Sequence, residues 1–180
     1  MRGLKAGRIL GGQTMLERAL ELASRYSALL ALSVREPGQA SGASVLLLTD
    51  DPALPGPLAG VASALRFAAE TGAPAVLTIP VDAPFLPDDL ALRLAGALAP
   101  GVGVALARSG DRLHPVCALW RAGLGQQLQA YASTGRGALM GLADAVGWAA
   151  VDWPTEPVDP FFNVNTPDDL ARAEALLSGG

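Results

Sequence analysis

The chain alternates between short runs of consecutive apolar residues and longer stretches in which apolar residues recur at helical spacing. In "TMLERALELASRY", Met15, Ala19 and Leu22 fall on one face of a helix. The pattern predicts helices at 14–26, 56–70 and 87–98, and strands at 28–34, 44–48 and 74–81. Pro57 suits the first turn of the second helix, where its missing N–H costs nothing, and Pro87 with two aspartates after it suits the start of the third.

The second half of the chain continues in the same way. It predicts two strands around a Ser-Gly-Asp turn within 103–120, helices near 123–133 and 137–146, and a short strand at "WAAVDW". In "NTPDDL", Thr166 is placed to cap a last helix, with Pro167 at its first position and Asp169 three residues after the cap. Strands buried on both faces that alternate with helices predict an α/β fold with a mostly parallel sheet. We expect residues 1–180 to form a single domain.

Composition narrows the classes of function. Apolar residues make up 51% of the chain and charged residues 17%, so most of the chain can be buried. The net charge of −4 is scattered, whereas nucleic-acid binders usually carry a basic stripe, so no nucleic-acid partner is expected. A lone cysteine, Cys117, excludes an internal disulfide and is typical of a reducing, cytoplasmic setting. The longest apolar runs are too short to span a bilayer, so no membrane partner is expected.

An aspartate follows the apolar strand in "AVLTIPVDAPFLPDDL", residues 75–90. Ligands bind beyond the carboxyl ends of strands in sheets of this class, and Asp82 stands at such an end. Pro80 and Pro84 restrict the backbone on either side of it. A single carboxylate suits Mg²⁺, which keeps several waters and binds substrate phosphates. The alternative interpretation is an ordinary turn or capping aspartate.

A second aspartate, Asp50, follows the strand "VLLLT" and precedes the loop "DPALPGPLAG", which enters a helix. A glycine-bearing loop at a helix N-terminus can hold an anion on backbone N–H groups. An ordinary strand-to-helix turn is the alternative interpretation of the same pattern.

Four motifs, taken together, resemble those of molybdenum cofactor guanylyltransferases. They are "DDPALPGPLAG", "IPVDAPFLPDDL", "RLHPVCALW" and "PFFNVNTPDDLARAEALL", in this order along nearly the whole chain. The resemblance implies a Rossmann-like three-layer sandwich of the nucleotide-diphospho-sugar transferase type. It implies transfer of GMP from GTP to molybdenum-molybdopterin, with release of pyrophosphate and Mg²⁺ as cofactor. It also implies GTP, the molybdopterin cofactor and other proteins of the cofactor pathway, such as molybdoenzymes, as partners.

The resemblance assigns most of the nucleotide end of the site. Asp82 matches the Mg²⁺ ligand, and Lys5 matches the loop lysine that balances phosphate charge; these two residues are the expected catalytic pair. Asp50 matches the nucleotide-site aspartate after the second strand, with Asp51 as the adjacent alternative. Gly56 matches the glycine that lets the chain approach the nucleotide.

Four further positions follow from the same motifs. Ser33 falls where some relatives carry an asparagine near the guanine, and a serine has fewer hydrogen-bonding groups than an amide, so the choice between GTP and CTP stays open. Asn163 and Asn165 match paired asparagines at the cofactor end; on a strand, side chains two residues apart would point into one cleft. His114, the single histidine, matches either a cofactor contact or a structural residue.

The chain departs from the family pattern at its beginning. The family opens with a strand and a loop of the form L-A-G-G-x-S-x-R-M-G, followed by the lysine, whereas "MRGLKA" begins inside that loop. We therefore expect the opening strand and the phosphate-cradling glycines to be absent, either because the start codon is assigned too far downstream or because the homologue is truncated. Two other functions stay open: a related nucleotidyltransferase that uses CTP or another phosphate acceptor, and an impaired homologue that only binds.

Overall fold

The computed structural model describes residues 7–40 and 44–178. Its strands are β1 (Ile9–Leu10), β2 (Gln13–Thr14), β3 (Ala31–Val34), β4 (Leu46–Thr49), β5 (Ala75–Thr78), β6 (Val104–Ser109), β7 (Arg112–Arg121) and β8 (Trp148–Trp153). Its helices are α1 (Met15–Tyr26), α2 (Pro57–Thr71), α3 (Leu90–Gly96), α4 (Gly125–Ala132), α5 (Leu139–Val146) and α6 (Pro167–Ser178), with short 3-10 turns η2 (Pro37–Ala40) and η3 (Ala122–Leu124). Every helix and strand that the pattern of apolar residues predicts is present, and a β1–β2 hairpin precedes α1. Among the described residues, no helix is both long and apolar enough to cross a membrane.

Helix α3 begins later than the sequence predicts. The helix expected from residue 87 starts at Leu90, and the two aspartates before it are engaged elsewhere. Asp88 pairs with an arginine of α1 at 3.0 Å, and Asp89 Oδ1 accepts a hydrogen bond from Trp153 Nε1 at 2.9 Å. These carboxylates therefore tie the segment before α3 to other elements, and no side-chain hydrogen bond caps the helix.

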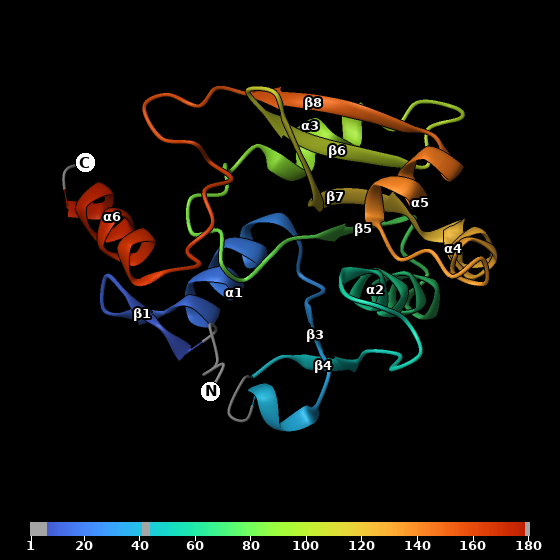
Figure 1. Cartoon of the computed structure of the whole chain (residues 1–180), viewed down its shortest axis with the longest axis horizontal. Helices are drawn as coiled ribbons and strands as arrows, with labels where there is room; N and C mark the ends of the chain where they lie inside the picture. Colours follow the sequence, from blue (N-terminus) through green and yellow to red (C-terminus); the bar gives the residue numbers. More distant parts are fainter. Residues whose placement is uncertain (1–6, 41–43, 179–180) are drawn as a thin grey trace.

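The strands form two sheets besides the β1–β2 hairpin (Figure 1). β5, β7, β6 and β8 lie in that order in a four-stranded sheet, in which β7 is antiparallel to both neighbours and β6 is parallel to β8. β3 and β4 form a separate parallel pair. The predicted α/β class is confirmed, but the larger sheet is mixed, because the hairpin within 103–120 places a reversed strand inside it.

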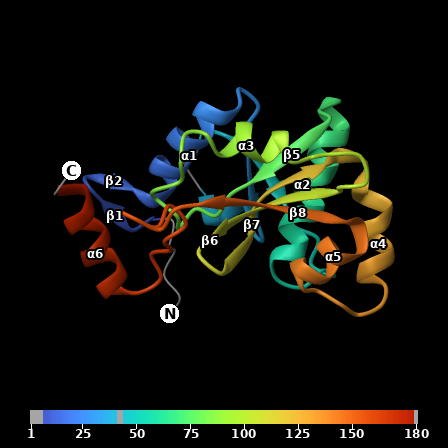
Figure 2. The ribbon, with the colours of Figure 1, turned by 90° about the horizontal axis from the view of Figure 1, so that it is seen from above.

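Alternate residues of β6 face two different helical layers. Val104 and Leu106 belong to a core cluster with side chains of α2, α4 and α5. Ala105 and Ala107 belong to a second cluster with side chains of α1 and α3. Figure 2 shows α1 and α3 on one side of the larger sheet and α4 and α5 on the other. The sheet is thus the middle of three layers, with a core on each face.

Helix α2 packs on both sheets. It contacts β3 and β4 of the small sheet and β5 and β7 of the large one. Its buried side chains Leu58, Val61 and Leu65 join the core that includes β6 and β7. It begins at Pro57, as the sequence predicts.

The last helix, α6, lies beside the β1–β2 hairpin, at one end of the molecule (Figures 1 and 2). A small buried cluster of Leu10, Met15, Val164 and Ala173 holds this end together. The predicted cap is confirmed, because the Asp169 N–H donates to Thr166 Oγ1 at 3.1 Å and the Thr166 N–H donates to Asp169 Oδ2 at 2.8 Å.

His114 is buried in β7. Its Nε2 lies 2.8 Å from Ser109 Oγ, and its ring stacks on Phe161 with centroids 4.7 Å apart. Burial lowers the pKa of His114; Asp159 opposes this shift, and Arg112 adds to it. The folded protein therefore keeps the ring neutral at pH values where the unfolded chain binds a proton.

We expect the free energy of unfolding to fall as the pH is lowered through 6.5, the ordinary pKa of histidine, because the unfolded chain then takes up a proton that folded His114 resists. The chain has a single histidine, so His114→Gln should remove this part of the slope. Urea unfolding of both proteins at several pH values above and below 6.5 measures the difference. Equal slopes in the two proteins would contradict the expectation.

Candidate active site

Asp82 lies in the segment that follows β5 and is half-buried. Its backbone carbonyl accepts a hydrogen bond from the Val164 N–H at 2.8 Å. This bond joins the segment "IPVDAPF" to the C-terminal motif "FNVNTP". Two motifs that are far apart in the sequence therefore meet at Asp82, as a shared site requires.

A second carboxylate, Asp159, lies in the same region. Burial, together with the charges of Asp82 and Asp159, raises the pKa of Cys117 to about 12, so both carboxylates act electrostatically on this thiol. Asp159 Oδ1 also accepts a hydrogen bond from the Phe161 N–H at 2.9 Å. The sequence analysis missed Asp159, although it stands directly before the quoted "PFFNVNTP".

Asp50 is held between β3 and α2. Its Oδ1 accepts hydrogen bonds from Ser33 Oγ at 2.5 Å and from Ser63 Oγ at 3.3 Å, and its N–H donates to the Val34 carbonyl at 2.9 Å. The Asp51 carboxylate instead accepts from the Ala53 N–H at 2.9 Å, within its own turn. Of the two adjacent candidates, Asp50 is therefore the one that faces neighbouring elements. Ser63 is buried, and the sequence analysis did not single it out.

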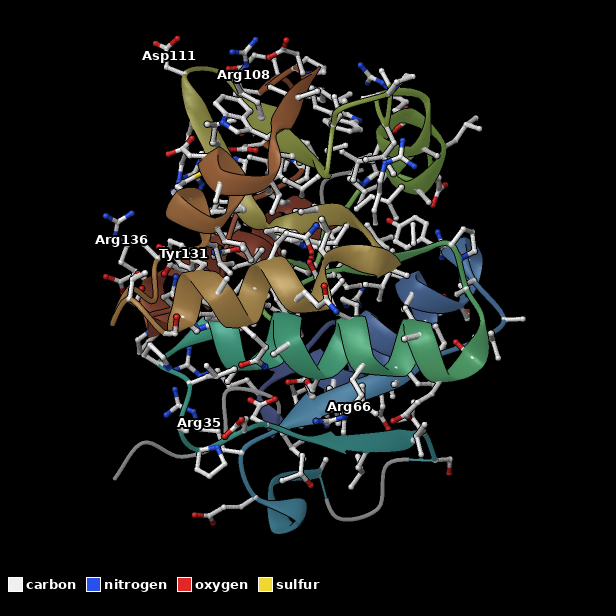
Figure 3. The ribbon with its side chains drawn as sticks, turned by 90° about the vertical axis from the view of Figure 1, so that its right-hand side faces the viewer. Arg35, Arg66, Arg108, Asp111, Tyr131 and Arg136 are labelled. Atoms are coloured by element: carbon white, nitrogen blue, oxygen red, sulfur yellow. The ribbon has the colours of Figure 1, made fainter. Side chains whose placement is uncertain are left out.

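The loop after Asp50 ends at Gly56, whose φ of 51° is a conformation that side chains other than glycine rarely adopt. No atom lies within 4 Å of the position that a Cβ of Gly56 would take, so the backbone is open there. A second loop packs against this one, because a side chain at Gly137 would collide with Pro55. Arg136 precedes this contact and is exposed; Figure 3 shows it on the same side of the molecule as Arg35.

A cavity of about 710 Å³ adjoins these groups. Its lining includes Ser33, Arg35, Asp50 and Gly56, and it reaches Val81, the neighbour of Asp82. The structure thus brings together three of the predicted nucleotide-binding residues and places Asp82 next to their cavity.

The remaining predicted residues have different outcomes. Lys5 lies outside the described residues. Asn163 is half-buried and Asn165 exposed, and the segment that carries them is irregular, so the expectation of a strand is wrong there. The backbone groups of Asn165 bond to the guanidinium of Arg8 and to Asp169, which is part of the cap of α6. The ring of His114 is enclosed by Ser109 and Phe161 and lines neither this cavity nor a smaller one at residues 155–159.

Known proteins resemble this chain over most of its length. Residues 1–150 match a family model described as the MobA-like NTP transferase domain. The chain is 40% identical to a molybdenum cofactor guanylyltransferase of Sinorhizobium fredii, in an alignment that covers 97% of this chain and 84% of that protein. It is also 40% identical to a molybdenum cofactor guanylyltransferase of Cereibacter sphaeroides, with 96% and 88% covered.

Solved structures share the fold. The molybdopterin-guanine dinucleotide biosynthesis protein A of Archaeoglobus fulgidus has a TM-score of 0.76 at 23% identity and covers 98% of this chain and 91% of its own. The 2-C-methyl-D-erythritol 4-phosphate cytidylyltransferase of Thermus thermophilus has a TM-score of 0.70 at 24% identity, with 98% and 95% covered. A Mycobacterium tuberculosis protein of this fold, solved in complex with manganese, has a TM-score of 0.60 at 14% identity, with 95% and 91% covered.

The structural likenesses establish the fold, and the sequence matches establish the family. The predicted lack of the family's opening strand stays a prediction. Because the chain is 40% identical to curated guanylyltransferases over nearly its whole length, it belongs to the molybdenum cofactor guanylyltransferase family, within the MobA-like NTP transferases.

Proposed function

We propose that this chain transfers the guanylyl group of GTP to the molybdenum cofactor, forming the guanine dinucleotide cofactor and pyrophosphate. The observation that carries the proposal is its 40% identity to guanylyltransferases across 97% of the chain. The structure supports it with two aspartates that follow β4 and β5, which are consecutive in the sequence, and one of them, Asp50, lines a cavity large enough for a nucleotide.

The reaction depends on how the two reactants are positioned and on how their negative charges are balanced. A phosphate oxygen of molybdopterin attacks the α-phosphorus of GTP; a P–O bond forms there while the bond to the leaving pyrophosphate breaks. The nucleophile is already an anion, so neither a covalent enzyme intermediate nor a general base is required. The protein must instead hold two anions close together in the correct geometry and reduce their repulsion.

At the nucleotide end, we assign Asp50 as a hydrogen-bond acceptor oriented by Ser33 and Ser63. In this arrangement the Ser33 hydroxyl donates to Asp50, so Ser33 orients the carboxylate rather than replacing an amide that reads the base. Gly56 precedes α2, and the free N–H groups and positive dipole end of that helix favour phosphate nearby. Lys5 keeps its predicted role in balancing phosphate charge.

At the other end, Asp82 fits a Mg²⁺ ligand. Within the described residues, no three His, Cys, Asp or Glu side chains gather as a metal site. Mg²⁺ commonly takes one or two carboxylates and completes its shell with water and substrate phosphates, so Asp82, with Asp159 nearby, suits it. When bound, the ion would neutralise charge that develops on the phosphates. Asn163, Asn165 and His114 remain our proposed cofactor-end residues, with His114 acting through its stack on Phe161.

The test of the function is an assay with molybdenum-molybdopterin as acceptor and either GTP or CTP as donor, which follows pyrophosphate and the dinucleotide product. Mg²⁺-dependent product from GTP supports the proposal. Product from CTP alone would overturn the guanylyl assignment in favour of cytidylyl transfer.

We expect Asp82→Asn to lower kcat for guanylyl transfer by about 10²–10³-fold, the usual loss when one charge-stabilising group is removed from an active site. Asp88→Asn is a matched control, because Asp88 is exposed and pairs with Arg25 on the surface. The control should retain activity within about twofold, since exposed ion pairs contribute little. Equal losses in both variants would contradict the role of Asp82.

We expect Asp50→Asn to weaken GTP binding by about tenfold, a loss of about 1.4 kcal/mol, because the charged acceptor becomes a neutral amide. Asp51→Asn changes the adjacent carboxylate, which accepts a hydrogen bond from the Ala53 N–H within its own turn, and should alter the Kd by less than about twofold. Calorimetric titration with GTP measures both. A larger effect from Asp51→Asn would assign the nucleotide site to Asp51.

A further inference from the structure

A second cavity, of about 260 Å³, lies where the connection after β8 meets α6. Its lining consists of residues 155–159 of that connection, together with Phe162 and with Arg172 and Leu176 of α6. Figure 1 shows the connection leaving β8 and turning back toward the middle of the molecule before α6 begins. Cavities that hold whole drug-sized ligands have about 300–1,000 Å³. This smaller cavity therefore suits one ring system and not a complete nucleotide.

The smaller cavity presents two carboxylates and one guanidinium. Glu156 is exposed, and within the described ranges no hydrogen bond or ion pair engages its carboxylate. Asp159 Oδ1 accepts from the Phe161 N–H at 2.9 Å, so Oδ2 is the oxygen of Asp159 that remains for a ligand. The guanidinium of Arg172 lies 5.1 Å from the centre of the Phe162 ring. The cavity thus combines hydrogen-bond acceptors on the connection with a flat cation–aromatic pair beside them.

Both cavities are linked to Asp82 through the backbone. The larger cavity reaches Val81, the chain neighbour of Asp82. The smaller cavity reaches Phe162, and the Val164 N–H, two residues further on, donates to the Asp82 carbonyl at 2.8 Å. Two residues of chain span at most about 7 Å, so the smaller cavity also comes close to Asp82. A ligand held by its ring in the smaller cavity can therefore extend a phosphate toward Asp82.

We propose that the smaller cavity binds the pterin ring of the acceptor, an assignment that rests on the proposed function. A pterin presents its N3–H and its 2-amino group side by side, and carboxylates accept hydrogen bonds from such an edge. Glu156 accepts from both groups, and Asp159 Oδ2 accepts from the remaining amino hydrogen. The flat ring packs beside Phe162 and Arg172, since aromatic rings and guanidinium planes stack on one another. The phosphate at the other end of the acceptor then points toward Asp82.

Other ligands fit these groups less well. The two carboxylates repel a free phosphate, and the guanidinium of Arg172 in the same lining repels a divalent cation. The described part of the chain also holds no cluster of three metal-binding side chains. The guanine base, in contrast, presents the same donor edge as a pterin. A binding experiment with both compounds separates these two sources of one chemistry.

The full chain is titrated with 6-hydroxymethylpterin, whose fluorescence reports binding, with and without saturating GTP. We expect binding in both conditions, because GTP occupies the larger cavity. The matching lumazine has oxygen in place of the 2-amino group and should bind at least about tenfold more weakly, since it lacks this donor. Displacement of the pterin by GTP or guanosine would assign the cavity to guanine and overturn the proposal. So would equal binding of the lumazine, or no binding of either compound.

Two protein variants locate the binding. Glu156→Gln removes the charged acceptor and should weaken pterin binding by about tenfold. Glu70→Gln makes the same change on α2, outside the lining, and should alter the affinity by less than about twofold. Both positions are exposed, so we expect both variants to fold. Equal affinities of the two variants for the pterin would overturn the proposal.

Turnover separates this proposal from the function on which it rests. In guanylyl transfer, Glu156→Gln should raise the KM for molybdenum-molybdopterin by about tenfold and leave the KM for GTP unchanged. If the native chain transfers GMP and Glu156→Gln keeps both constants, the assignment of the cavity is wrong while the function stands. If the pterin binds as expected but the native chain transfers nothing, the guanylyl function fails while the pterin site stands.

Discussion

The packing of helix α2 across two sheets is the constraint on which the nucleotide end of the site depends. Leu58, Val61 and Leu65 anchor it in the core, and burial of each such side chain contributes about 1.5–3 kcal/mol. The same helix carries Ser63, which donates to the Asp50 carboxylate. Because β3 supplies Ser33 and the Val34 carbonyl while α2 supplies Ser63, two elements that pack on each other fix the position of Asp50.

The other end of the site is assembled through the C-terminal segment. The backbone bond between Val164 and Asp82 joins residues that are more than eighty positions apart, and the stack of Phe161 on His114 holds the same segment against β7. The cap of α6 then fixes where this segment leaves the site. The geometry around Asp82 therefore depends on the last quarter of the chain being folded, which makes the C-terminal motif part of the site even where its side chains contact no substrate.

Features set by nearby residues were predictable from the sequence. The capping of α6 depends on Thr166 and Asp169, which are three positions apart, and α2 begins at the proline that the pattern indicated. The start of α3 was not predictable in this way, since the partners of Asp88 and Asp89 lie 63 and 64 residues away. Asp159 was missed for the same reason: a carboxylate in an irregular loop has no periodic signal, and only the fold places it beside Cys117.

The expectation that Asn163 and Asn165 share one strand face failed for a related physical reason. A strand pairs its backbone with a neighbouring strand, but the backbone N–H groups here form other hydrogen bonds. The Val164 N–H donates to the Asp82 carbonyl, and the Asn165 N–H donates to the Asp169 carboxylate. Each hydrogen bond fixes the backbone locally, but the two bonds do not form the regular hydrogen-bond ladder of paired strands. The motif thus forms a fixed irregular connection between the Asp82 segment and α6, and alternation of side chains does not apply to it. In this fold, individual backbone hydrogen bonds of this kind set the positions of the site residues that follow the strands. The motif can therefore be recognised by its sequence of residues, but it shows no periodic pattern.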